Sequence, residues 1–251
     1  MILPIDEVRS IPYKEYFGIM NLTEKQKKDR IAFAEKLEDE LLLMYELFGV
    51  LSDYSVADDN LIIEQLKQAY LSVAESFETP LDDYMMDVAD KFANDFVETT
   101  KKHIALKIGQ DIPTDKGFAI IMGIAGGTVI LNEYMDDGNS QIYEMPYRDV
   151  LMATNDGWFI SPDRAVFNAE NEANTVLNYK DYKEAKGNFK TWITENDERV
   201  RPTHIPLEGE KIPIGDLFVV GEALMRFPKD LEYAADYPEE IVNCRCSIKY
   251  S

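Results

Sequence analysis

The sequence changes character at Gly187, and this change most constrains the fold. Before it, apolar residues recur at three- and four-residue steps over long stretches, which is typical of amphipathic helices. After it, prolines and glycines interrupt the chain every few residues, so that only short strands and turns fit between them. We therefore predict an α+β protein. An N-terminal helical region precedes a C-terminal module in which one long helix packs on a small β-sheet.

Four helices are predicted from the periodicity and from local start signals. Thr23, with Gln26 three residues later, has the spacing of a capping box. Ser161-Pro162 is a capping residue followed by proline in the first turn. The predicted helices cover residues 23–49, 59–77, 79–103 and 164–185. The first three form an N-terminal bundle, and the fourth introduces the C-terminal module.

The remaining segments give weaker signals. The first 20 residues contain Pro4 and Pro12 and predict an extended or turn-rich arm, anchored by aromatic residues such as Phe17. The glycines within residues 123–127 lack the spacing of a phosphate-binding loop, so close packing explains them better. The predicted parts of the chain are a helical region (1–105), a less regular connecting region (106–160) and the C-terminal module (161–251).

The charge of the chain restricts its partners. The formal net charge is −21, which disfavours broad binding to nucleic acid or to an anionic membrane, because both need clustered lysine and arginine. The residues after Met1 lack the basic start and apolar run of a secretory signal. The longest apolar stretch, residues 118–131, is shorter than the about 20 residues that span a bilayer. We expect no membrane partner and a reducing compartment, where the two cysteines are thiols or metal ligands.

Cys244-Arg245-Cys246 is the sharpest local feature. In a last strand predicted at 244–250, residues two apart face the same way, so both sulfurs would chelate one soft metal ion. His204 would be the third ligand, and this set of donors suits zinc. The alternative is that both thiols are buried and behave as small hydrophobic side chains. We expect no other cofactor.

A second group of scarce side chains lies in the same stretch. Arg199 and Arg201 are predicted on one side of a strand, near His204. They would form an anion site or the positive part of a catalytic centre, with His204 as general base. The alternative, which we favour, is that the arginines pair with carboxylates such as Asp197, Glu172 or Asp216 and hold the sheet on the helix. No catalytic residue is assigned.

The closing stretch carries a series of motifs in a fixed order. They are K-T-W-I-T-E-N-D-E-R-V-R-P-T-H at 190–204, L-E-G-E-K-I-P-I at 207–214, F-P-K-D at 227–230 and E-E-I-V-N-C-R-C at 239–246. Together with the preceding helix, the series resembles the C-terminal region of the phage head morphogenesis family, the Mu F-like minor head proteins of tailed phages and prophages. The signature residues are Trp192, Arg199, Arg201, His204, Cys244 and Cys246.

This resemblance implies a minor capsid component without enzymatic activity. Such proteins associate with the portal during procapsid assembly and are implicated in DNA packaging or ejection. The expected partners are the portal protein and capsid or scaffold protein, with phage DNA contacted through the C-terminal module alone. The implied location is the interior of the procapsid and virion, and the bacterial cytoplasm during assembly.

An enzyme is the alternative function. A phage-encoded effector, nuclease-like or ADP-ribosyltransferase-like, would be centred on Arg201 and His204. A pocket that joins these two residues with Glu172 would favour it.

Overall fold

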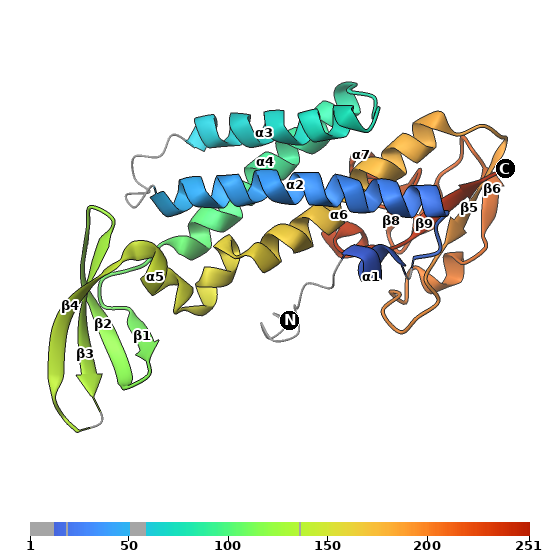
Figure 1. The fold of residues 1–251 in the computed structure, drawn as a ribbon. Coiled ribbons are helices and arrows are strands. Elements are labelled where there is room, and N and C mark those ends of the chain that lie inside the picture. The colour runs from blue at the N-terminus through green and yellow to red at the C-terminus, as the bar shows by residue number, and fades with distance from the viewer. Residues whose placement is uncertain (1–12, 19, 51–58, 136) are drawn as a thin grey trace. The chain divides into compact units, whose positions relative to one another are not determined.

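The fold was analysed in a computed structural model, which describes residues 13–18, 20–50, 59–135 and 137–251. The described residues form a mixed fold, as predicted, with long helices first and a long helix with small antiparallel sheets later (Figure 1). The chain divides into two compact units. Unit 1 contains described residues from 39–68 and 90–165, and unit 2 contains described residues from 11–38, 69–89 and 166–251.

The helices and strands follow in this order: α1 (Tyr13–Gly18), α2 (Glu24–Val50), α3 (Asp59–Ser76), α4 (Asp83–Ile104), β1 (Asp111–Thr114), β2 (Gly117–Ala125), β3 (Thr128–Met135), β4 (Ser140–Pro146), α5 (Tyr147–Met152), η2 (Asn155–Ile160), α6 (Pro162–Glu184), β5 (Phe189–Ile193), η3 (Ile205–Leu207), β6 (Lys211–Pro213), β7 (Phe218–Val220), β8 (Ala223–Met225), α7 (Leu231–Ala234), α8 (Pro238–Ile241) and β9 (Ser247–Tyr250).

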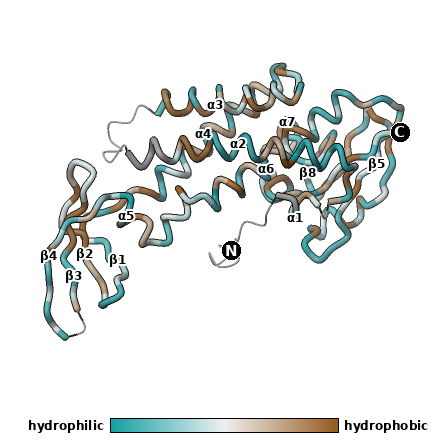
Figure 2. Tube along the Cα trace, in the orientation of Figure 1, coloured by the Kyte–Doolittle hydropathy of each residue, from teal (hydrophilic) through white to brown (hydrophobic). Residues whose placement is uncertain are grey.

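Local side-chain caps set the starts of the long helices. The capping box of α2 is confirmed, because Gln26 N donates to Thr23 Oγ1 at 3.3 Å and Thr23 N donates to Gln26 Oε1 at 3.1 Å. Figure 2 shows hydrophilic and hydrophobic residues alternating along the long helices. None of the helices in the described part of the chain is long and apolar enough to cross a membrane.

Two predicted boundaries near the N-terminus are wrong. The helix predicted from Thr79 begins at Asp83, because the carboxylate of Asp82 accepts a hydrogen bond from Met85 N at 3.4 Å and takes the capping role. The predicted arm contains α1, whose Phe17 is fully buried. Pro4 and Pro12 of that arm lie outside the described residues.

Unit 1 contains a sheet that the sequence did not predict. Its four strands are antiparallel in the order β1-β2-β3-β4 and occupy much of the region expected to be irregular. Gly126 and Gly127 form the two-residue turn between β2 and β3, with φ of 56° and 84°. Positive φ at both positions is typical of a type I′ hairpin turn and favours glycine. For Gly126 and Gly127, the prediction of close packing is therefore wrong.

The helical part of unit 1 is held by one buried cation and by aromatic contacts. Arg164, at the start of α6, is buried and donates to Thr100 Oγ1 at 2.8 Å and to the carbonyl oxygen of Phe159 at 2.5 Å. Its guanidinium also lies over the ring of Phe96, at 5.1 Å. Ser161 caps this helix, since its hydroxyl accepts from Arg164 N at 3.3 Å, as predicted.

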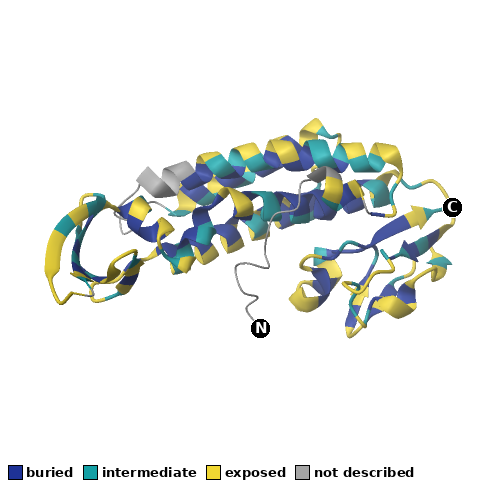
Figure 3. Ribbon diagram, turned by 60° about the horizontal axis from the view of Figure 1, so that its bottom comes forward, coloured by how far each residue is buried: buried dark blue, intermediate teal, exposed yellow. Residues whose placement is uncertain are grey.

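Unit 2 joins helical segments to the closing stretch of the chain. Its small sheet is antiparallel, in the order β6-β5-β9, and β7 and β8 form a separate hairpin. Ala169, Ala173 and Leu177 of α6 are buried, as their four-residue spacing along one face of the helix predicts. Figure 3 shows the buried residues in the interior of this part of the chain.

Two strand predictions in the closing stretch are wrong. Residues 198–200 form a turn and a bend instead of the predicted strand, because Val200 N donates to the carbonyl oxygen of Asp197 and closes the turn. The last strand begins at Ser247, so Cys244 and Cys246 precede it instead of lying in it. The cysteines therefore have a local geometry that strand alternation does not describe.

Candidate metal centre

The structure brings His204, Cys244 and Cys246 together in the interior of unit 2. The exposed fractions of the three residues are 1%, 2% and 4%. His204 Nδ1 lies 3.4 Å from Cys246 Sγ and 3.6 Å from Cys244 Sγ. The three donor atoms lie within 4.8 Å of one another. Among the described residues, this is the one group of three potential metal ligands with donor atoms so close together.

The ring of His204 is fixed by its surroundings. His204 Nε2 lies 3.0 Å from Oε2 of the buried Glu240, and Thr203 Oγ1 donates to the same oxygen at 2.7 Å. Trp192 contacts the ring edge-on, with centroids 5.7 Å apart and an interplanar angle of 87°. An ionised carboxylate only accepts hydrogen bonds, so this contact places a proton on Nε2. In the neutral ring, the lone pair of Nδ1 then faces the two sulfurs.

The pKa values of the two thiols are shifted in opposite directions. The pKa of Cys244 lies well below its ordinary value, chiefly because Cys246 donates a hydrogen bond to its sulfur, against the cost of burial. The pKa of Cys246 is raised by that hydrogen bond and by burial. One thiolate is therefore favoured within this pair, and a thiolate is the form that binds metals.

Asparagines of α6 hold the backbone that carries the two cysteines. Asn174 Nδ2 donates to the carbonyl oxygen of Cys244 at 3.2 Å. Asn178 Nδ2 donates to the carbonyl oxygens of Cys246 at 3.4 Å and of Pro228 at 3.3 Å. These contacts attach both ends of the Cys244–Cys246 segment to one face of α6.

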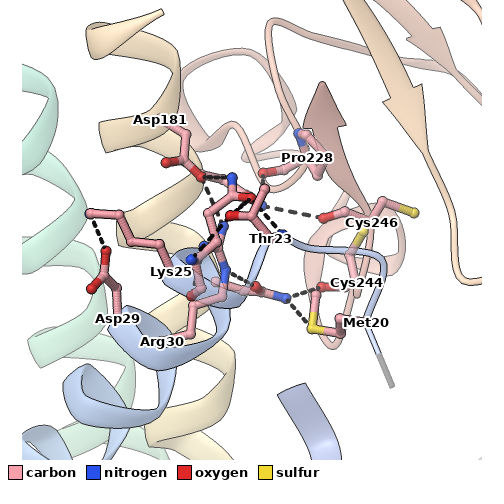
Figure 4. A network of polar contacts seen from close by, with 12 residues as sticks. Met20, Thr23, Lys25, Asp29, Arg30, Asp181, Pro228, Cys244 and Cys246 are labelled. Atoms are coloured by element: carbon pink, nitrogen blue, oxygen red, sulfur yellow. Dashed lines mark hydrogen bonds and ion pairs between the residues drawn. The ribbon is translucent and has the colours of Figure 1, made fainter. Parts of the chain in front are cut away.

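Arg30 of α2 in turn orients these asparagines. Its Nε donates to Asn174 Oδ1 at 3.0 Å, and one terminal nitrogen donates to Asn178 Oδ1 at 2.9 Å. The same nitrogen forms an ion pair with Asp181 at 3.2 Å. Figure 4 shows Arg30, Asp181 and the two cysteines in this network. The guanidinium thus fixes the amide oxygens, and the amide nitrogens point toward the cysteine segment.

Only part of this network was predictable from the sequence. In the helix predicted at 164–185, Asn168, Glu172 and Asn178 fall on or near neighbouring turns, which predicts a polar network with the chain that follows. Asn178 does contact that chain. Asn174 was missed, although it lies on the same helical face as Asn178 and the spacing was a usable signal. Glu172 was also expected in the network, but it accepts hydrogen bonds from Tyr70 OH at 2.8 Å and from Asn171 Nδ2 at 2.7 Å.

Arg199 and Arg201 lie near the cluster of His204 and the two cysteines, and they make different contacts. Arg201 donates a hydrogen bond to the carbonyl oxygen of Val242. Arg199 donates through its backbone N to Asp197 Oδ1 at 3.0 Å, and Arg245 forms an ion pair with the same oxygen at 2.6 Å. A cavity beside the cluster is lined by Arg199, Arg201, His204, both cysteines and four neighbouring residues, and Glu172 is not one of them. The pocket that would favour an enzyme is thus incomplete.

Two kinds of chemistry fit a histidine beside two thiols. The chain of contacts from Glu240 through His204 to a cysteine has the connectivity of a nucleophilic triad. However, the adjacent cavity has a volume of ≈ 10 Å³, which is about the space of one water molecule and too small for a substrate. Two sulfurs at nearly equal distance from one nitrogen suit a metal ion better, because a nucleophilic centre needs a single thiol.

The C-terminal part of the chain matches a known family. Residues 137–249 match the family model described as phage Mu protein F like protein. These residues contain β4, α6 and the His204–Cys244–Cys246 cluster, and for this part of the chain the match supports the family predicted from the motif series. No curated protein and no solved structure matches the chain.

Proposed function

We propose that this chain, as a Mu F-like protein, is a minor capsid protein that binds the portal inside the phage procapsid. There it assists head assembly, DNA packaging or ejection. The observation that carries the proposal is the family match over residues 137–249, which supports a role in phage head morphogenesis. Binding to the portal is a more specific claim than a role in head morphogenesis. Capsid and scaffold protein are further proposed partners.

The burial of the signature residues indicates how the module serves this role. Trp192 and His204 are almost completely buried, and both cysteines are buried with them. Side chains in these positions hold the module together and do not face a partner. We therefore assign partner binding to exposed surfaces, with these four buried signature residues as the framework that supports them.

An exposed apolar face in unit 1 is the surface that we assign to the portal. Phe118 and Tyr134 stack across β2 and β3 with centroids 5.2 Å apart, although they are 45% and 39% exposed. Ile142 of the edge strand β4 is 69% exposed. Antiparallel sheets usually place polar side chains on their solvated face, so these residues suit contact with another protein. The net charge of −21 also favours a protein partner over DNA.

Co-purification with the portal protein of the same phage or prophage tests the proposal. The wild-type chain, tagged and co-expressed with that portal, is expected to retain it through a salt wash. Phe118→Ser combined with Ile142→Ser should reduce the retained portal at least about tenfold, which corresponds to ~1.4 kcal/mol. Val219→Ser, at a 64% exposed position in unit 2, is the matched control and should bind like wild type.

Portal binding and the assignment of the contact surface are refuted by different results. If the wild-type chain retains no portal, portal binding is refuted. If both the wild type and the Phe118/Ile142 variant retain it equally, the portal is the partner but the sheet face is not the contact.

The alternative, an effector enzyme centred on Arg201 and His204, has less support. His204 is 1% exposed, and both its ring nitrogens already face buried partners. The Arg201 guanidinium donates to a backbone carbonyl of its own chain. A general base needs to reach a proton on a substrate, and the small cavity leaves no room for one.

A further inference from the structure

We propose that His204, Cys244 and Cys246 bind one zinc ion, which clamps the turn before η3 to the segment before β9. This inference goes beyond the role in the phage head and does not depend on it. It rests on the positions of the donor atoms, on the groups that orient them and on the space beside them.

The separations of the histidine nitrogen from the two sulfurs match those of a zinc site. Zinc bonds of about 2.05 Å to nitrogen and about 2.3 Å to sulfur, at a tetrahedral angle, place the nitrogen and the sulfur about 3.6 Å apart. The observed Nδ1–Sγ distances are 3.4 Å to Cys246 and 3.6 Å to Cys244. A lone pair on Nδ1 accepts one S–H hydrogen bond well, whereas a metal accounts for both short contacts together.

The second ring nitrogen of His204 has the partner that a metal-binding histidine needs. Histidine ligands of zinc usually donate their other N–H to a carboxylate or carbonyl, which fixes the tautomer and raises the basicity of the ligand. Glu240 Oε2, 3.0 Å from Nε2, takes this position, and Thr203 fixes the carboxylate. The backbone of the two cysteines is held in turn by Asn174 and Asn178.

Charge and space are also consistent with one zinc ion. Two thiolates and a neutral imidazole balance the charge of Zn²⁺, so that the ion and its three protein ligands are together neutral. The cavity of ≈ 10 Å³ that all three ligands line has about the size of one water molecule, and a water there supplies the fourth ligand. A larger group does not fit, so we assign the ion a structural role.

Metal content of the purified full-length chain tests the site. After incubation with zinc and removal of unbound metal, we expect about one zinc per chain by mass spectrometry of the metal. Exchange with Co²⁺ should give the thiolate-to-cobalt absorption and the visible bands of a tetrahedral site. A mercurial reagent that titrates both thiols should release the zinc in proportion, which ties the ion to the cysteines without any variant.

Variants then assign the ligands. Cys244→Ser and Cys246→Ser should each lose the bound metal, whereas His103→Asn, which removes the other histidine of the chain, should keep it. Glu240→Gln should weaken zinc binding 10- to 100-fold, as expected for a residue that orients a ligand. Less than about one zinc per ten chains in the wild type overturns the proposal. So does a Cys244→Ser/Cys246→Ser double variant that keeps its zinc, because the ion would then lie elsewhere.

Discussion

Replacing Arg30 by methionine tests the network that supports the closing stretch. Arg30 is 1% exposed and connects α2 to Asn174, Asn178 and Asp181 of α6. Methionine keeps most of the apolar stem but removes the guanidinium. Two amide oxygens then lose their donor, and Asp181 loses its ion-pair partner.

The magnitude follows from the burial of both partners. Removing one member of a buried ion pair costs about 3–5 kcal/mol, because the other charge is left without compensation. Asp181 is 26% exposed and can be partly hydrated in the variant, so we expect the lower end, about 3 kcal/mol. At roughly 2–4 °C per kcal/mol for a chain of this size, the Tm should fall by about 6–12 °C.

Thermal and urea unfolding, followed by circular dichroism, measure this change. Lys28→Met is the matched control, because Lys28 is an exposed cation of the same helix and its loss should change the free energy of unfolding by less than about 0.5 kcal/mol. Adding Asp181→Asn to Arg30→Met should cost less than the sum of the two single changes, since both remove the same ion pair. If Arg30→Met and Lys28→Met unfold alike, the buried guanidinium does not stabilise the fold and the reasoning is refuted.

Three further predictions concern single positions. Burial, with a smaller effect of Glu38, raises the pKa of Glu170 to about 8, so the folded state keeps a proton that the unfolded state releases. The free energy of unfolding should therefore fall as the pH rises from about 5 to 9. Glu170→Gln should remove part of this fall and be more stable than wild type by roughly 2 kcal/mol at pH 9, after allowance for solvent screening. If urea unfolding gives wild type and variant the same dependence of the free energy of unfolding on pH, this prediction is contradicted. Gly221 has φ of 61°, and a Cβ there would meet the Glu240 carboxylate, so Gly221→Ala should weaken zinc binding at least about tenfold, as loss of an orienting contact does. The control is Gly209→Ala, with φ of 76° and open space around it, which should leave the zinc affinity unchanged. If Gly221→Ala and Gly209→Ala bind zinc equally well in competition with a chelator, the role of Glu240 is refuted. Gly157→Ala would place a Cβ 2.7 Å from the backbone Cα of Met152, so it should destabilise unit 1 by about 1–3 kcal/mol in urea unfolding, and an unchanged midpoint would count against the described packing of η2 on α5.

Features that depend on neighbouring residues were predictable from the sequence. The capping box of Thr23 and Gln26 and the start of α6 at Ser161 are local, because each side chain caps a backbone group three residues away. The sheet of unit 1 was not predictable in this way. Its exposed face carries Phe118 and Ile142, and these apolar residues remove the alternation that identifies a half-buried strand.

Features that depend on distant residues were beyond the sequence. Arg30 and its partner Asn174 are 144 positions apart, and no local pattern joins them. The meeting of Cys244 and Cys246 was expected from strand alternation, but they precede β9 and are placed by contacts of their carbonyl oxygens with α6. The proximity of their sulfurs was thus predicted for the wrong physical reason.

The protein content of procapsids tests the central proposal most directly. Procapsids of the parent phage would be purified with and without the portal, and this chain would be quantified by mass spectrometry against the portal subunit. A minor capsid protein that binds the portal should be present in a small, constant ratio to the portal and should be lost when the portal is absent. Its absence from portal-containing procapsids, with the chain abundant in the same lysate, would contradict the account.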